Sequence, residues 1–228
     1  MKVAFCISGL FKPSITNSAA YENKFAYLTD KIKKYNADTF VYSFSKEIAS
    51  EVIDIFKPKK FKFEVQKEFA DEISGIDSIL DRQTAKRVFS MFYSRKKVCE
   101  LRREFEKENK SNYDVVVLCR PDLGYIFTEN LEIPDLSKID NNYLYSMYWN
   151  QLNAGMADWF FISNTNNIDF LSDIYNNLPL YLDKNSKYKK SPIHSEIINE
   201  THMLNPHCLL KYYLLDNDKF SLDFLRFS

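Results

Sequence analysis

The sequence lacks an excess of either charge, and it also lacks a long apolar run. Among its 228 residues, 31 are lysine or arginine and 31 are aspartate or glutamate, so the formal net charge is zero. Proteins that bind nucleic acids usually carry a basic excess that neutralises phosphates. We therefore expect no nucleic-acid partner, although a local basic cleft is compatible with this balance. No stretch approaches the roughly 20 apolar residues of a membrane-spanning helix, so we expect no transmembrane segment.

Cysteine is scarce, and its spacing is unlike that of a zinc site. The four cysteines, Cys6, Cys99, Cys119 and Cys208, form no CxxC pair, and two of them lie inside strand-like runs. This pattern favours buried free thiols in a reducing compartment over disulfides or metal ligands. The apolar start, MKVAFCISGLF, is too short for the central region of a signal peptide, and no small-residue cleavage site follows it. We expect a soluble, cytoplasmic protein.

Several common nucleotide and catalytic motifs are also missing. The chain contains neither GxGxxG nor a Walker A motif, which argues against a Rossmann dehydrogenase and a P-loop NTPase. It has no GxSxG nucleophile elbow either. The function must therefore be sought in less specific patterns.

Strand and helix patterns alternate along the first half of the chain. Apolar or alternating runs predict strands at 2–8, 37–44, 59–65 and 114–119. Apolar residues at helical spacing predict helices at 19–35, 47–56 and 84–109. Strands that alternate with helices favour an α/β fold with a mostly parallel central sheet flanked by helices.

The second half of the chain has a more mixed pattern. We predict strands at 141–147 and 158–163, and helices at 168–178 and 195–205. No internal repeat and no low-complexity linker divides the sequence. The prediction is therefore one domain, 1–228, with a mixed C-terminal half.

Two of the predicted strands end in residues that suit a ligand. Ligands of open α/β sheets bind outside the carboxyl ends of the strands. The first strand ends at Ser8 and Gly9, where a glycine lets the backbone approach a phosphate or a sugar closely, and Lys12 adds a positive charge. The plain alternative is an ordinary turn after a strand.

The second such end reads Arg120-Pro121-Asp122. Asp122 would suit a hard divalent cation that bridges phosphate oxygens, and Arg120 would suit a carboxylate or a phosphate. Pro121 fixes the backbone between them. The same three residues are also typical of a plain turn, in which the aspartate accepts hydrogen bonds from neighbouring amides. Both interpretations stay open.

Five segments occur in an order that resembles a known family. They are CISGLFK, SMFYSRKKVCEL, YDVVVLCRPDL, ADWFFIS and SPIHSE. Together they resemble bacterial surface-polysaccharide glycosyltransferase-like proteins over nearly the whole chain. The resemblance implies a GT-A fold, which is Rossmann-like, with a nucleotide-binding half at 1–125 and an acceptor- and sugar-binding half at 126–228.

The resemblance also implies a metal–diphosphate site, where this chain departs from the family pattern. In GT-A enzymes an acidic DxD-like motif holds a metal ion and the donor diphosphate, whereas the matching place here has one acid, Asp122. One alternative is that Asp122 binds Mn²⁺ or Mg²⁺, with His194 as a late ligand. The other is a metal-independent site, in which Lys12, Lys97 and Arg120 neutralise the diphosphate.

Asp158 and Glu196 are the candidate catalytic residues. Asp158 opens the strand 158–163, and Glu196 matches the late helix glutamate of the family pattern. An inverting transfer needs a general base for the acceptor hydroxyl. The alternatives are a turn-capping aspartate and an ordinary first-turn glutamate. Tyr93, on the long helix, is a candidate for stacking on the nucleotide base, with core packing as its alternative.

We therefore expect an enzyme that moves a sugar from a nucleotide-sugar donor to a glycan or lipid-linked glycan acceptor. The resemblance implies a role in capsule or lipopolysaccharide biosynthesis, in the cytoplasm, with contact to the inner face of the membrane left open. Because the motif has a single acid, an alternative stays open, namely a non-catalytic protein that binds nucleotide sugars or glycans on the same scaffold. A nucleotidyltransferase fits less well, because the segment ISGLF lacks a glycine-rich loop.

Overall fold

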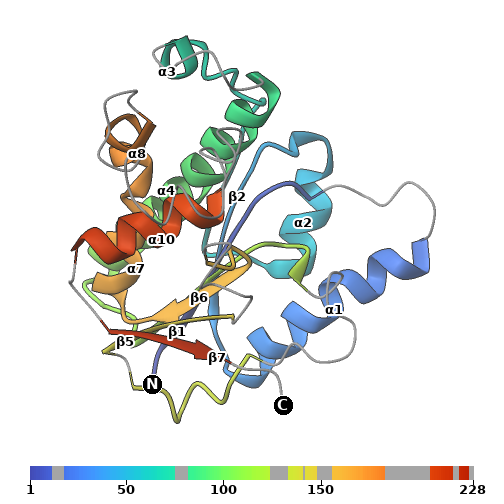
Figure 1. Ribbon diagram of the computed structural model, residues 1–228. Helices are drawn as coiled ribbons and strands as arrows, with labels where there is room; N and C mark the ends of the chain where they lie inside the picture. The colour runs from blue at the N-terminus through green and yellow to red at the C-terminus, as the bar shows by residue number, and fades with distance from the viewer. Residues whose placement is uncertain are drawn as a thin grey trace.

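A seven-stranded sheet runs through the part of the chain that the computed structural model describes, residues 1–11, 18–74, 82–123, 133–140, 142–147, 156–182, 206–217 and 221–225. The strands are β1 (Val3–Ser8), β2 (Asp38–Ser43), β3 (Lys60–Phe63), β4 (Val115–Cys119), β5 (Tyr143–Met147), β6 (Phe160–Ser163) and β7 (Ser221–Leu225). Their order across the sheet is β3-β2-β1-β4-β6-β5-β7. Both halves of the sequence therefore contribute to one sheet (Figure 1).

Most neighbouring strands in this sheet are parallel. β1 pairs in parallel with β2 and with β4, β2 does so with β3, and β5 does so with β7. β6 is antiparallel to both of its neighbours, β4 and β5. The prediction of an α/β fold with a mostly parallel sheet and a more mixed second half is confirmed.

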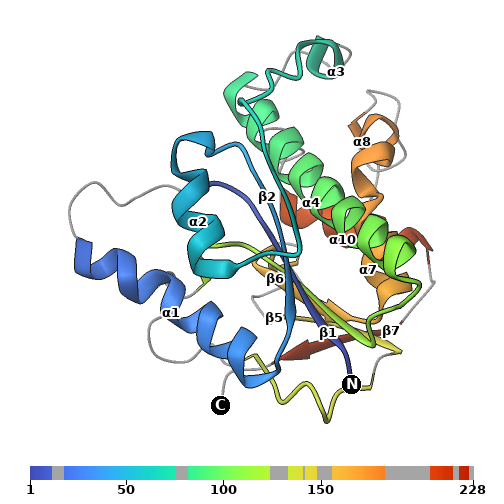
Figure 2. The same cartoon turned by 180° about the vertical axis from the view of Figure 1, so that it is seen from behind.

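Helices cover both faces of the sheet. They are α1 (Ser18–Lys34), α2 (Ala49–Phe56), α3 (Ala70–Ser74), α4 (Arg82–Asn109), α7 (Thr165–Ser172), α8 (Ile174–Leu182) and α10 (Pro206–Asn217), with a 3₁₀ turn at Lys46–Ile48. α1 and α2 lie on one face, and α4, α7, α8 and α10 lie on the other (Figures 1 and 2). In the described residues, no helix combines the length and the apolar character that crossing a membrane requires.

The alternation of side chains along the central strands explains the two helical layers. In β1, Phe5 and Ile7 belong to the core cluster on the α1 and α2 side, while Cys6 belongs to the cluster on the α4 side. β4 divides in the same way, with Val117 on one side and Leu118 on the other. A strand that is buried on both faces reads as a continuous apolar run, which is why the sequence predicted both strands.

The second half differs from the prediction in its helices and in its last strand. The helix expected at 168–178 is interrupted at Asp173, which divides it into α7 and α8. Asn164 caps the first of these, because its side-chain oxygen accepts a hydrogen bond from Asn167 N at 2.9 Å. α10 and β7 were not predicted, and the helix expected at 195–205 lies outside the described residues.

Cys6, Cys99 and Cys119 are buried and free, as the sequence predicted. Burial raises the pKa of the Cys6 and Cys119 thiols above the ordinary value of 9.0. They are therefore protonated at neutral pH and pack as small apolar side chains. The side chain of Cys208 lies outside the described part.

Candidate functional site

The two strand ends singled out in the sequence meet in one cleft. β1 and β4 are parallel neighbours, so their carboxyl ends lie at the same edge of the sheet. Ser8 and Gly9 from the end of β1 line a cleft of about 710 Å³ together with Arg120 and Asp122 from the end of β4. This edge is where an open α/β sheet binds its ligands.

The loop after β1 is held in place by the end of β2. Gly9 has φ of 137°, a conformation that favours glycine. Its carbonyl accepts a hydrogen bond from Ser43 Oγ at 2.7 Å, and Phe11 N donates to Ser45 Oγ at 3.0 Å. Ser43 and Ser45 are both buried. Two hydroxyl groups of the neighbouring strand end therefore fix the backbone that forms this side of the cleft.

The facing wall of the cleft comes from one side of α4. Its lining residues form adjacent pairs that repeat every four positions along the helix, and they are Lys86, Arg87, Ser90, Met91, Ser94 and Arg95. Ser90 Oγ accepts a hydrogen bond from Gln66 Nε2 at 2.6 Å. Lys86 Nζ pairs with Glu68 Oε1 at 2.5 Å, while Arg87 is exposed. The helical repeat thus turns a polar and basic stripe towards the strand ends.

The charged side chains that line the described cleft are mostly cationic. Lys86, Arg87, Arg95 and Arg120 are basic, and Asp122 is the one acid among them. The chain as a whole has no net charge, so this local excess is a property of the fold. Such a cleft suits an anionic ligand.

Arg120 and Asp122 form a two-point ion pair at the end of β4. Arg120 Nε donates to Asp122 Oδ1 at 2.9 Å, and Arg120 Nη2 donates to Asp122 Oδ2 at 2.7 Å. Burial disfavours the charged guanidinium, but the carboxylates of Asp122 and Asp158 outweigh it, so the pKa of Arg120 rises above its ordinary value. Both oxygens of Asp122 are therefore already engaged, in the geometry that arginine and carboxylate prefer.

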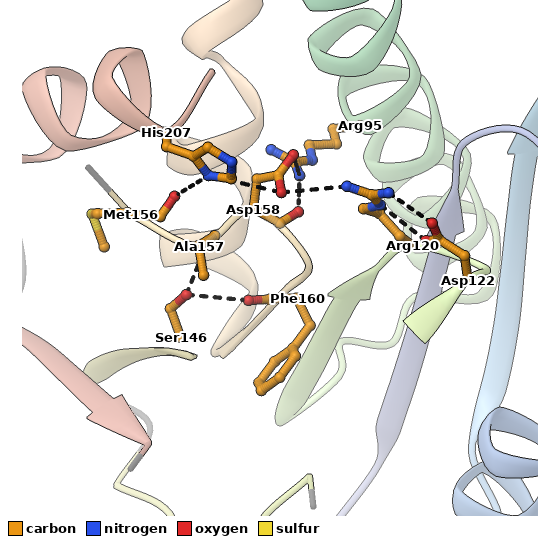
Figure 3. Close-up of polar contacts among 9 residues, drawn as sticks. All are labelled: Arg95, Arg120, Asp122, Ser146, Met156, Ala157, Asp158, Phe160 and His207. Carbon is orange, nitrogen blue, oxygen red and sulfur yellow. Dashed lines mark hydrogen bonds and ion pairs between the residues drawn. The ribbon is translucent and has the colours of Figure 1, made fainter. Parts of the chain in front are cut away.

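Asp158 comes to the cleft because β6 runs antiparallel to β4. Cys119 pairs with Phe160, and Arg120 N donates to Trp159 O at 3.0 Å, so the residues after β4 face those before β6. Asp158 is 3 % exposed, and its Oδ1 lies 3.4 Å from Arg120 Nη1. Figure 3 shows its carboxylate between Arg120 and Arg95. It lies behind the lining of the cleft.

Arg95 reaches Asp158 from α4. Its Nη2 donates to the carbonyl oxygen of Asp158 and lies 3.7 Å from Asp158 Oδ2. Its guanidinium also faces the rings of Phe92 and Phe161, at 5.7 and 5.5 Å from their centroids. Burial lowers the pKa of Arg95 to about 10, because the charged form loses water. Within the described residues, its buried Nη1 has no hydrogen-bond partner.

The segment before β6 is held on two sides. His207, in the first turn of α10, accepts a hydrogen bond from Met156 N at its carbonyl oxygen, 3.0 Å away, and its Nδ1 lies 2.6 Å from Met156 O. The same Nδ1 lies 3.8 Å from Asp158 Oδ1. Ser146 in β5 donates to Ala157 O at 3.2 Å. These contacts fix the position of Asp158, and Figure 3 draws those of the His207 ring and of Ser146.

Two other predicted site residues, Tyr93 and Lys97, do not themselves line the cleft. Tyr93 packs in an aromatic cluster whose other members are Tyr42, Phe44, Phe69 and Tyr175. Lys97 pairs with Glu100, with Nζ and Oε2 at 2.6 Å. Neither side chain is among the residues that line the cleft, although Tyr93 stacks on Phe44, which does line it. Lys12, His194 and Glu196 lie outside the described residues.

The described residues do not provide the donor set that a divalent cation needs. Mn²⁺ and Mg²⁺ prefer several free oxygen ligands. Both oxygens of Asp122 bind Arg120, and the carboxylate of Asp158 is buried between two arginines. No group of three or more histidine, cysteine, aspartate or glutamate side chains in the described ranges is arranged to hold a metal ion.

The sequence analysis missed four ionisable side chains that shape the cleft or support it, Lys86, Arg87, Arg95 and His207. A signal for two of them is present, because Arg87, Met91 and Arg95 follow at intervals of four on a helix whose apolar pattern was already clear. The position of His207 depends on the contact of α10 with the segment before β6, and no local pattern encodes it.

No protein-family model matches the chain, and no curated protein matches it either. The function must therefore be argued from the cleft and from the resemblance in the sequence.

Proposed function

We propose that the protein is a glycosyltransferase that binds a nucleotide-sugar donor in this cleft and passes the sugar to a glycan acceptor. The observation that carries the proposal is the convergence of Ser8, Gly9, Arg120 and Asp122 with a basic stripe of α4 at the carboxyl edge of the sheet. A volume of about 710 Å³ is within the usual range of small-molecule sites.

The topology supports the GT-A part of the proposal. The strand order β3-β2-β1-β4-β6-β5-β7, with β6 antiparallel to its neighbours, agrees with the GT-A fold that the sequence resemblance implies. The cleft also lies at the end of β4, where the family pattern has its DxD-like motif. The nucleotide-binding half is then 1–125, and the acceptor and the sugar are bound by 126–228. The role in capsule or lipopolysaccharide assembly rests on the resemblance alone.

The chemistry of such a transfer sets two demands. The bond between the sugar C1 and the leaving phosphate oxygen breaks while the acceptor oxygen bonds to C1, so negative charge builds on the leaving group. Lys86, Arg87 and Arg120 are placed to neutralise that charge.

In an inverting enzyme the proton of the acceptor hydroxyl must pass to a general base. Asp158 is ill suited to this task, since it is buried and paired with two arginines, so Glu196 is the stronger candidate.

The pairing of the aspartates with arginines favours a second candidate function, a non-catalytic protein that binds nucleotide sugars or glycans. Asp122 and Asp158 are the two acids at or behind the described cleft, and each is held by a guanidinium group. A protein that binds an anion without reacting with it needs no free base. The two candidates share the cleft and differ in turnover.

A thermal-shift panel tests donor binding. UDP-, GDP-, CDP- and CMP-sugars are added separately, and we expect one nucleotide class to raise the midpoint of unfolding in a concentration-dependent way, because a ligand that binds only the folded state stabilises it. Donor hydrolysis or transfer is then followed with that class. Binding with turnover supports the enzyme, and binding without turnover supports the second candidate. If no class shifts the midpoint, the proposed function is wrong.

A further inference from the structure

We infer that Arg120 takes the place of a divalent cation in this cleft, so that the phosphate groups of the donor are bound by basic side chains without a metal ion. The inference rests on the proposed function, and it departs from the metal-dependent site that the resemblance implies.

The position of Arg120 is the first argument. Its guanidinium bridges two carboxylates, Asp122 at 2.9 and 2.7 Å and Asp158 at 3.4 Å. A metal ion in a site of two acids would lie between the same carboxylates, where Figure 3 shows the guanidinium. The protein therefore supplies its own fixed cation at the end of β4.

The balance of charge is the second argument. Asp122 and Asp158 contribute two negative charges, and Arg120 and Arg95 contribute two positive charges within contact distance of them. A divalent ion would add to a cluster that is already neutral, or it would have to displace Arg120. Displacement would leave the half-buried guanidinium, 32 % exposed, without the carboxylates that now hold it.

The remaining cations of the cleft are the third argument. Arg87 is exposed and lines the cleft, and Lys86 pairs with Glu68, whose side chain is 73 % exposed. These two charges are not cancelled inside the cleft. A guanidinium can bind two phosphate oxygens at once, so the lining already contains the groups that a diphosphate needs.

Arg95 has a buried hydrogen-bond donor that a ligand can satisfy. Its side chain is 5 % exposed, it lines the cleft, and its Nη1 has no hydrogen-bond partner within the described ranges. A buried donor without a partner is costly. A ligand oxygen that accepted from Nη1 would remove this cost, and an anion does so while a metal ion does not.

The first experiment measures metal binding directly. Manganese(II) alone is titrated into the wild-type protein and followed by electron paramagnetic resonance, which separates free from bound ion. We expect all of the added manganese to stay free at protein concentrations that would detect a site with a Kd of about 100 μM. A stoichiometric site that Asp122→Asn removes would overturn the inference.

The second experiment repeats the panel of UDP-, GDP-, CDP- and CMP-sugars by calorimetry, once with EDTA and once with manganese. We expect the class that binds to do so in EDTA, with a Kd that manganese changes by less than about threefold. Binding that requires manganese refutes the inference and leaves the proposed function in place. Binding of no class under either condition refutes both.

Variants test the side chains. Arg87→Met should weaken metal-free binding of the nucleotide-sugar class that binds about tenfold, while Arg103→Met, on the same helix but outside the cleft, should leave the Kd unchanged.

Arg120→Met removes the cation between Asp122 and Asp158 and should create manganese binding that the wild type lacks. If Arg120→Met does not fold, the wild-type titrations and Arg87→Met still decide the matter. Equal Kd values for Arg87→Met and Arg103→Met would count against the inference.

Discussion

Gly9 and Pro121 meet where β1 and β4 end, and a Cβ atom added to Gly9 would lie 3.1 Å from Cδ of Pro121. The two residues belong to the two segments that form the floor of the cleft. Gly9 also has φ of 137°, which side chains other than hydrogen disfavour. The close approach of the two strand ends therefore depends on the absence of a side chain at position 9.

The substitution Gly9→Ala should lower the free energy of unfolding by about 1–3 kcal/mol, the usual cost of holding a residue in a sparsely populated backbone region. Urea unfolding followed by circular dichroism measures the change. Ser8→Ala is the matched control, because it removes a side-chain atom in the preceding residue without backbone strain. Equal stability of Gly9→Ala and the wild type would show that the loop adapts at no cost.

Asp122→Asn should leave the chain folded and lower turnover by roughly 10²-fold, because the amide cannot hold both nitrogens of Arg120 as the carboxylate does, and a misplaced group costs about that much in rate. Circular dichroism and donor hydrolysis are measured on the same sample. Asp135→Asn provides the control, since Asp135 pairs with Lys138 away from the cleft. Wild-type turnover in a folded Asp122→Asn variant would remove Asp122 from the reaction.

Arg102 and Arg103 are neighbours on α4 that should differ sharply in their effect on stability. Arg102 is fully buried and pairs with Glu106 at 3.0 Å and with Asp169, whereas Arg103 is 39 % exposed and pairs with Asp169 at 2.8 Å. Arg102→Met leaves the buried carboxylate of Glu106 without its cationic partner and should cost about 3–5 kcal/mol. Arg103→Met should cost about 1 kcal/mol or less. Urea unfolding of both variants checks the contrast, which similar losses would contradict.

Glu64 should make part of the stability depend on acid pH. Burial alone would raise its pKa, but hydrogen bonds from Lys62 and Tyr42 outweigh burial and lower the pKa below the ordinary 4.5. A carboxyl whose pKa is lower in the folded state stabilises that state above the ordinary pKa. The contribution is therefore present at neutral pH and is lost as the pH falls below 4.5 and through the lowered value.

Urea unfolding of the wild type and of Glu64→Gln, at a series of pH values from neutral to acid, measures this contribution. The difference in stability between the two proteins should shrink as the solution is acidified below the ordinary glutamate pKa. Glu51→Gln, an exposed glutamate on α2, provides the comparison. A difference that stays constant with pH would contradict the role of Glu64.

The sequence alone predicted those elements whose pattern is local. β1 and β4 are buried on both faces, so each appears as an uninterrupted apolar run. α4 shows its helical spacing over most of its 28 residues. Because both strands are parallel, the sequence also predicted that Gly9 and Asp122 lie at the same edge of the sheet, and both line the cleft.

The parts that were missed depend on pairing between distant segments. The segment FFIS does not encode the antiparallel direction of β6, which brings Asp158 to Arg120, because three apolar residues and a serine fit either direction. Tyr93 stays a candidate for stacking on a nucleotide base; its ring packs in the aromatic cluster next to Phe44, which lines the cleft, but Tyr93 itself is not among the lining residues. The phase of a helix relative to a cleft is set by tertiary packing, which a single sequence does not reveal.

The strand order also determines when the cleft can form during synthesis. β1, β2, β3 and β4 are neighbours of one another, so that part of the sheet has all its members once residue 119 has left the ribosome. β5 lies between β6 and β7, which are both translated after it. Until 160–163 emerge, the nascent chain has an unpaired β4 edge, and Arg120 has not yet met Asp158. The nascent polypeptide therefore presents an open strand edge, on which other chains can pair, throughout that interval.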